Sequence, residues 1–434
     1  MSRAGFPAWS DHIRYENNQY WSDDLTMPAA HLSLVGAQQR SLPDNDVRRT
    51  VNATKRDLVA EAVRIQPLLM ENSQRHDELN ALSPEVVEAL HEAGLFGMWV
   101  PAELGGSELS PRESLEVIST LAYADPATAW VVMAAALATG TGGAYADERA
   151  LPRLFGGERF PVIAGQGTRL GTAKVAEGGY LLSGDWSFGS GLKHSGWVHT
   201  AAAIPETGEA RIFLLPVEHA QLDESSWDVL GLKGTGSIDY HLRDVFVPEE
   251  FSYDMMLEEP RRGGQLFSIG TIKFSALCHS GWAIGAGRRL LDEVLKLAQA
   301  GKGRAGQLAK DAGFHAEVAK IEGKFRAARA FLFETWAGVE EALAAGQKMS
   351  LRQETLVRLG ISHMTWTAYD VAEFALRSTA TTAIRPGVIE HYIRDILVAT
   401  THLTSSQPVQ EAIGRELAGL APGEHWVFLG LEKD

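Results

Sequence analysis

The order of the hydrophobic patterns along the chain constrains its fold more than any other feature. From Asp44 to about residue 155, apolar residues recur every three or four positions, which is typical of amphipathic helices. Between about residues 156 and 255, short apolar runs alternate with turns rich in Gly, Pro and Asp, which is typical of β-strands. Helical spacing then returns and continues to the C-terminus. This order predicts a mostly α-helical protein with a central β domain.

The same patterns predict four segments. Residues 1–43 are polar, aromatic and irregular, and we expect them to form an N-terminal arm. Residues 44–155 form a predicted helical domain, residues 156–255 a β domain, and residues 256–434 a helical bundle. This order argues against a Rossmann domain, in which strands and helices alternate within one sheet.

Several residue pairs mark where the predicted helices begin, because Pro suits the first helical position and Ser or Asp caps the free amides before it. These pairs are Ser83-Pro84, Ser110-Pro111 and Asp125-Pro126. The helix predicted after Asp125 is apolar on nearly every side, so we expect it to be buried.

Composition excludes several classes of function. The formal net charge of −15 argues against a nucleic-acid partner, because binding phosphates requires a basic surface. The single cysteine, Cys278, rules out an internal disulfide and a cysteine zinc site, and we expect no metal site. No uninterrupted apolar stretch is long enough to span a bilayer, and the first residues lack the apolar core of a signal peptide. We therefore expect a cytoplasmic protein with no membrane partner.

The glycine-rich segments do not match known nucleotide-binding loops. Residues 165–171 and 231–237 lack the required spacing and are not followed by helical patterns. The P-loop, HExxH and GxSxG motifs do not occur, which argues against nucleotide hydrolysis, zinc proteolysis and α/β-hydrolase chemistry.

Five separated segments of the chain carry a family resemblance. They are GLFGMWVPAELGG (94–106), ADPATAWV (124–131), SGDWSFGSGLKHSGW (183–197), GLKGTGSIDYHLRDVFVPEEF (231–251) and RDILVATTH (394–402). Together and in this order, they resemble the acyl-CoA dehydrogenases over roughly residues 45–420. In detail they are most similar to that family's oxygenase branch of two-component flavin-dependent monooxygenases, which includes 4-hydroxyphenylacetate 3-hydroxylase oxygenases, dibenzothiophene monooxygenase and amino-sugar N-oxygenases.

The resemblance implies a fold, a cofactor and a reaction. The fold would be an N-terminal helical domain, a β-barrel-like middle domain and a C-terminal four-helix bundle, assembled as a homotetramer. Reduced FMN or FAD, supplied by a separate flavin reductase, would react with O2 to give a C4a-(hydro)peroxide. One oxygen atom would then pass to an aromatic, nitrogen or sulfur centre of a small hydrophobic substrate.

The resemblance also implies residues that bind the flavin. Ser190 matches the hydroxyl that bonds flavin N5 in this fold, although a serine that satisfies its own turn is the structural alternative. Phe188 matches an aromatic residue that packs against the ring system. Lys233, Thr235 and Ser237 match a loop beside the flavin, in which the family has arginine at the position of Lys233.

His402 is the predicted catalytic residue near the C-terminus, together with Ser190. It matches a histidine beside the reactive edge of the flavin, where an imidazole can donate a hydrogen bond or accept a proton. The next position, Leu403, is where the dehydrogenases carry the glutamate that removes a substrate proton. Leucine cannot act as that base, so oxygenation is favoured over dehydrogenation.

Two departures from the family limit this interpretation. Several phenol-hydroxylating members have a histidine in the region where this chain has Leu137-Ala138-Thr139-Gly140. The segments that hold the adenine half of FAD are also altered, which predicts weak flavin binding. An acyl-CoA dehydrogenase-like enzyme performing α,β-dehydrogenation is the main alternative, and a non-catalytic flavin-storage or assembly protein is the third.

Overall fold

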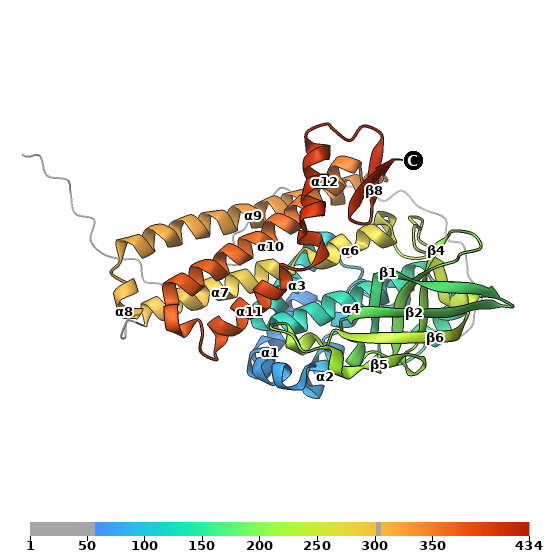
Figure 1. The fold of residues 1–434 in the computed structure, drawn as a ribbon, viewed down its shortest axis with the longest axis horizontal. Helices are drawn as coiled ribbons and strands as arrows, with labels where there is room; N and C mark the ends of the chain where they lie inside the picture. The colour runs from blue at the N-terminus through green and yellow to red at the C-terminus, as the bar shows by residue number, and fades with distance from the viewer. Residues whose placement is uncertain (1–56, 301–304, 434) are drawn as a thin grey trace, which may run out of the picture. The chain divides into compact units, whose positions relative to one another are not determined.

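The computed structural model describes residues 57–300 and 305–433, so the predicted arm at residues 1–43 lies outside the described chain. Within these ranges, a first group of helices is followed by a β-sheet and then by a second group of helices (Figure 1). The fold is therefore mostly α-helical with a central sheet, as the hydrophobic patterns predicted. The helices of the first group are α1 (Leu58–Leu79), α2 (Pro84–Glu92), α3 (Pro111–Ala124), α4 (Pro126–Tyr145) and α5 (Leu151–Phe155).

The helix starts fall where the sequence predicted them. Pro84 and Pro111 each occupy the first turn of their helices, and Ser110 forms a reciprocal capping box with Glu113. The side chain of Asp125 accepts a hydrogen bond from the amide of Thr128 at the start of α4. Among the described helices, α4 is long and apolar enough to cross a membrane, but 83% of its most apolar window is buried inside the protein. Its apolar surface therefore belongs to the core.

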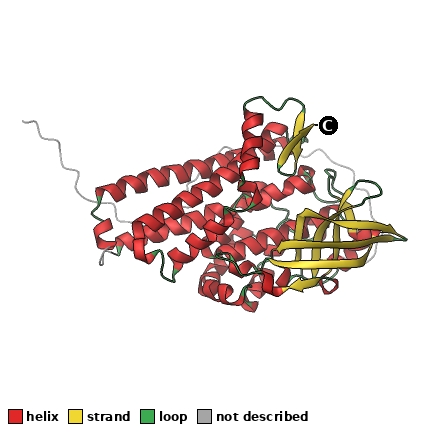
Figure 2. Ribbon diagram, in the orientation of Figure 1, coloured by secondary structure: helices red, strands yellow, loops and turns green. Residues whose placement is uncertain are grey.

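A seven-stranded sheet fills the middle of the described chain (Figure 2). Its strand order is β5-β6-β2-β1-β3-β4-β7, and all neighbours are antiparallel except β1 and β3. The register of β2 against β6 shifts between Trp186 and Gly189, so the end of β2 leaves regular pairing just before Ser190. The strands are β1 (Ile163–Ala176), β2 (Gly179–Gly189), β3 (Trp197–Ala203), β4 (Ala210–Pro216), β5 (Gln221–Asp223), β6 (Ile238–Pro248) and β7 (Ser252–Asp254).

The second helical group contains the predicted four-helix bundle, formed by α7, α9, α10 and α11 (Figure 1). A small separate apolar cluster joins α12 to the C-terminal hairpin through Val409, Ile413 and Trp426. The proposed domain boundaries at residues 155 and 255 stay predictions. The elements are α6 (Thr271–His279), α7 (Trp282–Gln299), α8 (Ala305–Leu308), α9 (Ala312–Ala344), α10 (Leu351–Thr379), α11 (Val388–Ala399), α12 (Gln407–Leu417), β8 (Glu424–Val427) and β9 (Gly430–Lys433).

Candidate active site

Three of the predicted flavin-binding residues form a buried chain of hydroxyl groups. The Ser190 Oγ lies 2.6 Å from the Ser237 Oγ, which lies 2.8 Å from the Thr235 Oγ1. Thr235 in turn donates a hydrogen bond of 2.7 Å to the carbonyl of Leu232. All three hydroxyl side chains are buried. The orientation of Ser190 is therefore set by neighbours on the turn between β5 and β6.

Phe188 lies immediately before this chain and has an unusual conformation. Its φ of 64° lies in the left-handed region, which is unfavourable for a bulky residue, and 66% of its surface is exposed. The edge of its ring contacts Trp227 at a centroid distance of 6.1 Å. An exposed aromatic ring on a strained backbone, next to a buried hydroxyl chain, is a surface on which a planar ligand can pack.

Lys233 begins the short 3-10 turn Lys233–Thr235, and its side chain is partly exposed. Its carbonyl accepts a hydrogen bond from the indole Nε1 of Trp227 at 3.2 Å. Trp227 therefore contacts both the Lys233 backbone and the Phe188 ring. These contacts place Lys233 on the same turn as Thr235, and its role toward a phosphate or carbonyl stays a prediction.

His402 lies in a separate cavity, where it stacks on a second histidine. The ring centroids of His402 and His279 are 4.1 Å apart, and their planes are inclined by 23°. Trp130 meets both imidazoles edge to face, at centroid distances of 5.5 and 5.6 Å. The cavity is small, with a volume of about 10 Å³, which is room for about one water molecule. Its lining consists of Trp130, Met133, His279, Trp282, Ala283, Thr365, Ala399, His402 and Thr404.

Hydrogen bonds orient both imidazoles. The Nδ1 of His279 lies 2.9 Å from the carbonyl oxygen of Ser275, which can only accept, so this nitrogen carries the proton. The Nδ1 of His402 accepts a hydrogen bond of 3.4 Å from the backbone amide of Thr404 and lies 2.9 Å from the hydroxyl of the same residue. In the neutral state, His402 therefore carries its proton on Nε2. Burial lowers the pKa of His279. Burial, and to a smaller extent repulsion from His279, lowers the pKa of His402 well below its usual value.

Helix α4 connects the hydroxyl chain to the imidazole cavity. Gly234 and Gly191, beside the hydroxyl residues, both lie against this helix. A Cβ placed on Gly234 would be 3.0 Å from the Cβ of Ala127, and a Cβ placed on Gly191 would be 3.3 Å from the Cγ1 of Val131. Trp130 and Met133, on the same stretch of helix, line the cavity. Because an α-helix rises about 1.5 Å per residue, the two features lie about one helical turn apart along α4.

Helix α11 makes a second connection. Its Asp395 carboxylate accepts a hydrogen bond of 2.6 Å from the amide of Leu232, at the base of the hydroxyl turn. One turn later, Ala399 lines the imidazole cavity. A Cβ at Gly231 would lie 2.5 Å from the carbonyl of Arg394, so only glycine allows the turn to approach α11 this closely.

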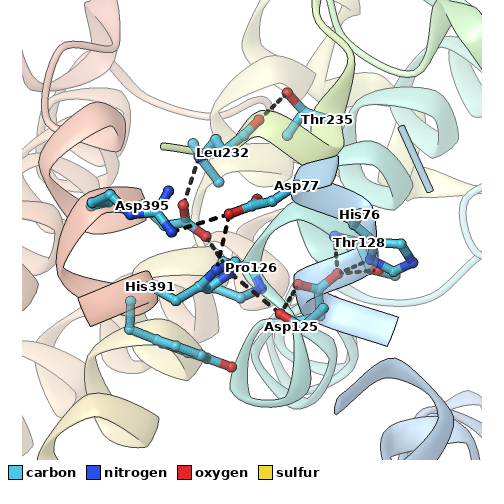
Figure 3. A network of polar contacts seen from close by, with 12 residues as sticks. His76, Asp77, Asp125, Pro126, Thr128, Leu232, Thr235, His391 and Asp395 are labelled. Atoms are coloured by element: carbon cyan, nitrogen blue, oxygen red, sulfur yellow. Dashed lines mark hydrogen bonds and ion pairs between the residues drawn. The ribbon is translucent and has the colours of Figure 1, made fainter. Parts of the chain in front are cut away.

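A buried polar network supports this junction (Figure 3). His391 lies 3.1 Å from the Asp395 carboxylate and 3.3 Å from that of Asp77. Burial alone would lower the pKa of His391, but the two carboxylates raise it to about 11, and Asp395 has the larger effect. On the far side, Asp125 lies 2.9 Å from the Nδ1 of His76. Burial would raise the pKa of Asp125, but His76 lowers it to about 2.

The structure brings together some of the predicted site residues and separates others. Ser190, Thr235 and Ser237 are in direct contact, with Phe188 and Lys233 on the same two segments. His402 lies in its own cavity beside Trp130 and His279. Leu403 is 47% exposed and is absent from the cavity lining, although its position in the family holds a catalytic base. The backbone turns outward there because the 3-10 helix Leu403–Ser405 follows His402.

Sequence reasoning missed His279, Trp282 and Thr365. His279 ends α6 within the unremarkable run Leu277-Cys278-His279-Ser280, and its partner His402 belongs to a distant segment. Nothing in the sequence of α6 indicated a functional site, because a single histidine in an apolar helix is usually a core residue whose hydrogen bonds are satisfied. Cys278 is buried and bonds the carbonyl of Met133 at 3.3 Å, and burial raises the pKa of its thiol.

The donor set of this region fits a flavin. A fixed hydroxyl at Ser190 lies beside the exposed ring of Phe188, which matches a cofactor that has a flat aromatic face and hydrogen-bonding ring nitrogens. Residues 57–300 and 305–433 contain no group of three or more His, Cys, Asp or Glu side chains placed to hold a metal ion. Phe188, Ser190 and the Lys233–Ser237 turn are therefore the residues that would hold the ring system.

Comparison with known proteins places the chain in a family. Residues 46–158 match the family model of the acyl-CoA dehydrogenase N-terminal domain, and residues 277–407 match that of the C-terminal domain. Together the two matches span more than half of the chain.

Individual relatives are monooxygenases. Indole-3-acetate monooxygenase of Pseudomonas putida is 28% identical over 363 residues, which cover 80% of this chain and 89% of the relative. The flavin-dependent monooxygenase oxygenase subunit HsaA of Mycobacterium tuberculosis is 29% identical over 202 residues, or 45% of this chain and 51% of the relative. The crystal structure of the HsaA monooxygenase from that organism superposes with a TM-score of 0.77 at 20% identity, covering 85% of this chain and 99% of that one. The chain thus belongs to the acyl-CoA dehydrogenase family, and its relatives within that family are oxygenase components of flavin-dependent monooxygenases.

Proposed function

We propose that the protein is the oxygenase component of a two-component flavin-dependent monooxygenase. It takes reduced FMN or FAD from a separate reductase and inserts one atom of O2 into an aromatic, nitrogen or sulfur centre of a small hydrophobic substrate. The observation that carries this proposal is the connection, through α4, of the buried hydroxyl chain at Ser190 to the imidazole cavity at His402. The activities named for the relatives support it.

Each residue of the site has a defined part in this function. Reduced flavin, when bound, supplies the two electrons that activate O2. Ser190, fixed by Ser237, offers a hydroxyl of constant orientation to the ring system, and Phe188 offers an aromatic face. His402 offers an Nε2–H donor to the cavity. Trp130 meets both imidazoles edge to face and forms an apolar wall of this space.

The dehydrogenase alternative lacks its essential group. Removal of an acyl-CoA α-proton requires a carboxylate against the substrate carbon, and the described cavity lining contains none. Leu403 faces solvent in part, and Glu416, thirteen positions later on α12, is paired with Arg352 at 3.0 Å. The storage alternative accounts for a flavin-binding surface but gives no role to the stacked imidazoles.

The decisive experiment supplies chemically reduced FMN or FAD to the protein without oxygen, and then admits ¹⁸O2. A panel of phenols, indoles, amines and thioethers is present, and mass spectrometry measures ¹⁸O in the products. Incorporation into one of these classes supports the proposal. Complete conversion of O2 to hydrogen peroxide with no labelled product in any class would contradict it, and bleaching of bound FAD by an acyl-CoA would establish the dehydrogenase.

Ser190→Ala tests the hydroxyl chain within the same assay. We expect the fraction of O2 lost as hydrogen peroxide to rise, because one hydrogen-bonding partner at a reacting centre contributes about 10²-fold to rate. Ser195→Ala is the matched control, since the Ser195 hydroxyl bonds the Leu192 carbonyl at 3.0 Å. If both variants lost the same fraction of O2 as hydrogen peroxide, Ser190 would have no part in the mechanism.

We also propose a cytoplasmic location and a homotetrameric assembly. The resemblance to the acyl-CoA dehydrogenases and the net charge of −15 support these two proposals. Light scattering on the eluting protein measures the assembly, and a monomeric mass would contradict the tetramer. Fractionation of cells that express the chain tests its location, and recovery in the membrane fraction would contradict a cytoplasmic protein.

A further inference from the structure

A side chain of helix α10 holds the turn that carries His402. The indole Nε1–H of Trp366 donates a hydrogen bond of 3.1 Å to the backbone carbonyl of Ser405, across 39 positions of sequence. The Trp366 ring is 38% exposed and contacts Tyr369 at a centroid distance of 5.5 Å. The polar atom of this partly exposed side chain is therefore used to hold the backbone of another segment.

Ser405 is the last residue of the 3-10 helix that follows His402. Its amide donates to the carbonyl of His402 at 3.0 Å, so the two residues are the ends of one hydrogen-bonded turn. The Ser405 hydroxyl is buried and has no hydrogen-bond partner among the described residues. Ser405 is therefore held through its backbone, with His402 at its amide and Trp366 at its carbonyl.

The closed turn determines which nitrogen of His402 carries the proton. The Nδ1 accepts from the amide of Thr404 inside the turn, so the proton of the neutral ring is on Nε2. This amide reaches Nδ1 because the turn brings a side chain and a backbone group two residues apart together. An open turn would let either ring nitrogen carry the proton and would let the ring rotate. A donor without a fixed direction loses the advantage of orientation.

Helix α10 meets the His402 turn from a second direction. Thr365, the residue before Trp366, lines the same small cavity as His402 and Thr404. Its hydroxyl donates 2.9 Å to the carbonyl of Ile361 within the helix, so its side chain has a fixed orientation. Successive residues of an α-helix point about 100° apart, so Thr365 can face the cavity while Trp366 reaches the end of the turn.

Other contacts attach the rest of the C-terminal segment to α10. Gln410 of α12 donates to the Ser362 hydroxyl at 3.2 Å. The indole Nε1–H of Trp426, in the C-terminal hairpin, donates to the Thr355 hydroxyl at 2.9 Å. The guanidinium of Arg358 lies 4.3 Å from the centroid of the same indole. These contacts do not involve Trp366, so α12 and the hairpin remain attached when its N–H is removed.

We propose, on the basis of the proposed function, that Trp366 is a positioning residue for His402. Its indole N–H holds the Ser405 carbonyl, keeps the 3-10 turn closed, and so fixes the His402 ring with its proton on Nε2. Trp366 is not among the residues that line the cavity, so it acts on the reaction through His402.

The first test removes the N–H group and keeps an aromatic ring. Trp366→Phe is compared with Trp426→Phe, which loses the same kind of hydrogen bond to the same helix, and thermal unfolding checks that both are folded. With a substrate that the unmodified enzyme oxygenates, we expect Trp366→Phe to form product about tenfold more slowly, because small misplacements of a catalytic group are costly. Flavin affinity should not change, and Trp426→Phe should keep the parent rate. A folded Trp366→Phe enzyme with the parent rate would overturn the proposal.

The second test asks whether Trp366 acts through His402. Trp366→Phe is introduced into the parent and into a His402→Gln background, and the two changes in rate are compared as a double-mutant cycle. We expect the loss of about tenfold in the parent and no further loss beside His402→Gln, because the positioned imidazole is already absent. The same fold-loss in both backgrounds would show a general structural effect and would overturn the positioning role.

The third test needs no turnover. Hydrogen exchange measured by mass spectrometry compares peptides that cover residues 400–407 with peptides that cover residues 409–433. We expect Trp366→Phe to speed exchange in the first region alone and Trp426→Phe to speed it in the second, because each hydrogen bond holds its own part of the segment. Unchanged exchange at residues 400–407 in Trp366→Phe, or an equal increase in both regions, would contradict the proposal.

Failure of this proposal differs from failure of the proposed function. If the unmodified enzyme forms no product with any substrate class, the proposed function fails, and the catalytic consequence of Trp366 fails with it. Hydrogen exchange then still decides whether Trp366 holds the turn. If the unmodified enzyme is active and the Trp366→Phe losses are absent, the monooxygenase function stands and the positioning role alone is overturned.

Discussion

The backbone amide of Leu232 donates a hydrogen bond of 2.6 Å to the carboxylate of Asp395, across 163 positions of sequence. This contact joins the turn that carries the hydroxyl chain to the helix that lines the imidazole cavity. Leu232 has a φ of 54°, so the turn has an unfavourable backbone conformation that an external partner must hold in place. Asp395 is fully buried and also pairs with His391.

Replacing Asp395 by alanine should therefore destabilise the protein by about 3–5 kcal/mol, because it leaves the charged His391 without one of its buried partners. Asp395→Asn should recover part of this loss, since its side-chain oxygen can still accept from Leu232. Chemical unfolding measures both changes. Asp228→Ala, at an exposed aspartate, is the control and should change the free energy of unfolding by less than about 0.5 kcal/mol. A loss no larger than that for Asp395→Ala would contradict the role assigned to this contact.

His391 should make the stability depend on alkaline pH. Its pKa is raised from the ordinary value of 6.5 to about 11 in the folded protein, so the folded state holds a proton that the unfolded chain releases between these values. The resulting stabilisation is complete below pH 6.5 and is lost as the pH rises through about 11. The free energy of unfolding should fall by about 1.0–1.4 kcal/mol per pH unit between pH 7 and 9 because of this group. His391→Gln should flatten that slope, and parallel pH curves for the two proteins would show that His391 is not the source.

Phe188 should separate flavin binding from stability. Glycine at this position relieves the left-handed backbone strain but increases the freedom of the unfolded chain, so Phe188→Gly should change stability by less than about 1 kcal/mol. The affinity for flavin should fall about tenfold, because an aromatic packing surface is lost. Fluorescence titration of FMN and FAD measures the affinity. Phe246→Ala, which removes another exposed aromatic ring, is the control and should leave the affinity for flavin unchanged. An unaltered affinity in Phe188→Gly would exclude Phe188 from the cofactor site.

His402 and Leu403 are adjacent in sequence but differ in surroundings, so they form a matched pair. His402→Ala removes the Nε2–H donor and the ring stacked on His279, and product formation should fall about 10²-fold while flavin affinity changes little. Leu403→Ala removes a side chain that is 47% exposed and should keep most of the activity. Product analysis and flavin titration give the two readouts. Equal losses of binding and turnover in His402→Ala would make His402 a structural residue.

Local rules predicted the framework of the fold. The Ser110 and Asp125 caps begin α3 and α4 where the sequence places them, because capping and the conformational restriction of proline act between neighbouring residues. The burial of α4 followed from its uniformly apolar composition. The resemblance to the acyl-CoA dehydrogenases singled out Ser190, Thr235 and Ser237, and the structure adds that their hydroxyls touch.

Local rules did not predict the close approach of distant segments. His279 carries no motif, and its pairing with His402 arises because α6 and the segment after α11 both pack against α4 at Trp130. The outward position of Leu403 depends on the 3-10 turn that follows His402, and the φ of Phe188 depends on the register shift between β2 and β6. The sequence by itself determined the order of the helices and strands, and its family resemblance singled out Ser190, Thr235 and Ser237. Only the tertiary structure decided which imidazoles share a cavity, because side-chain packing between remote segments sets that contact.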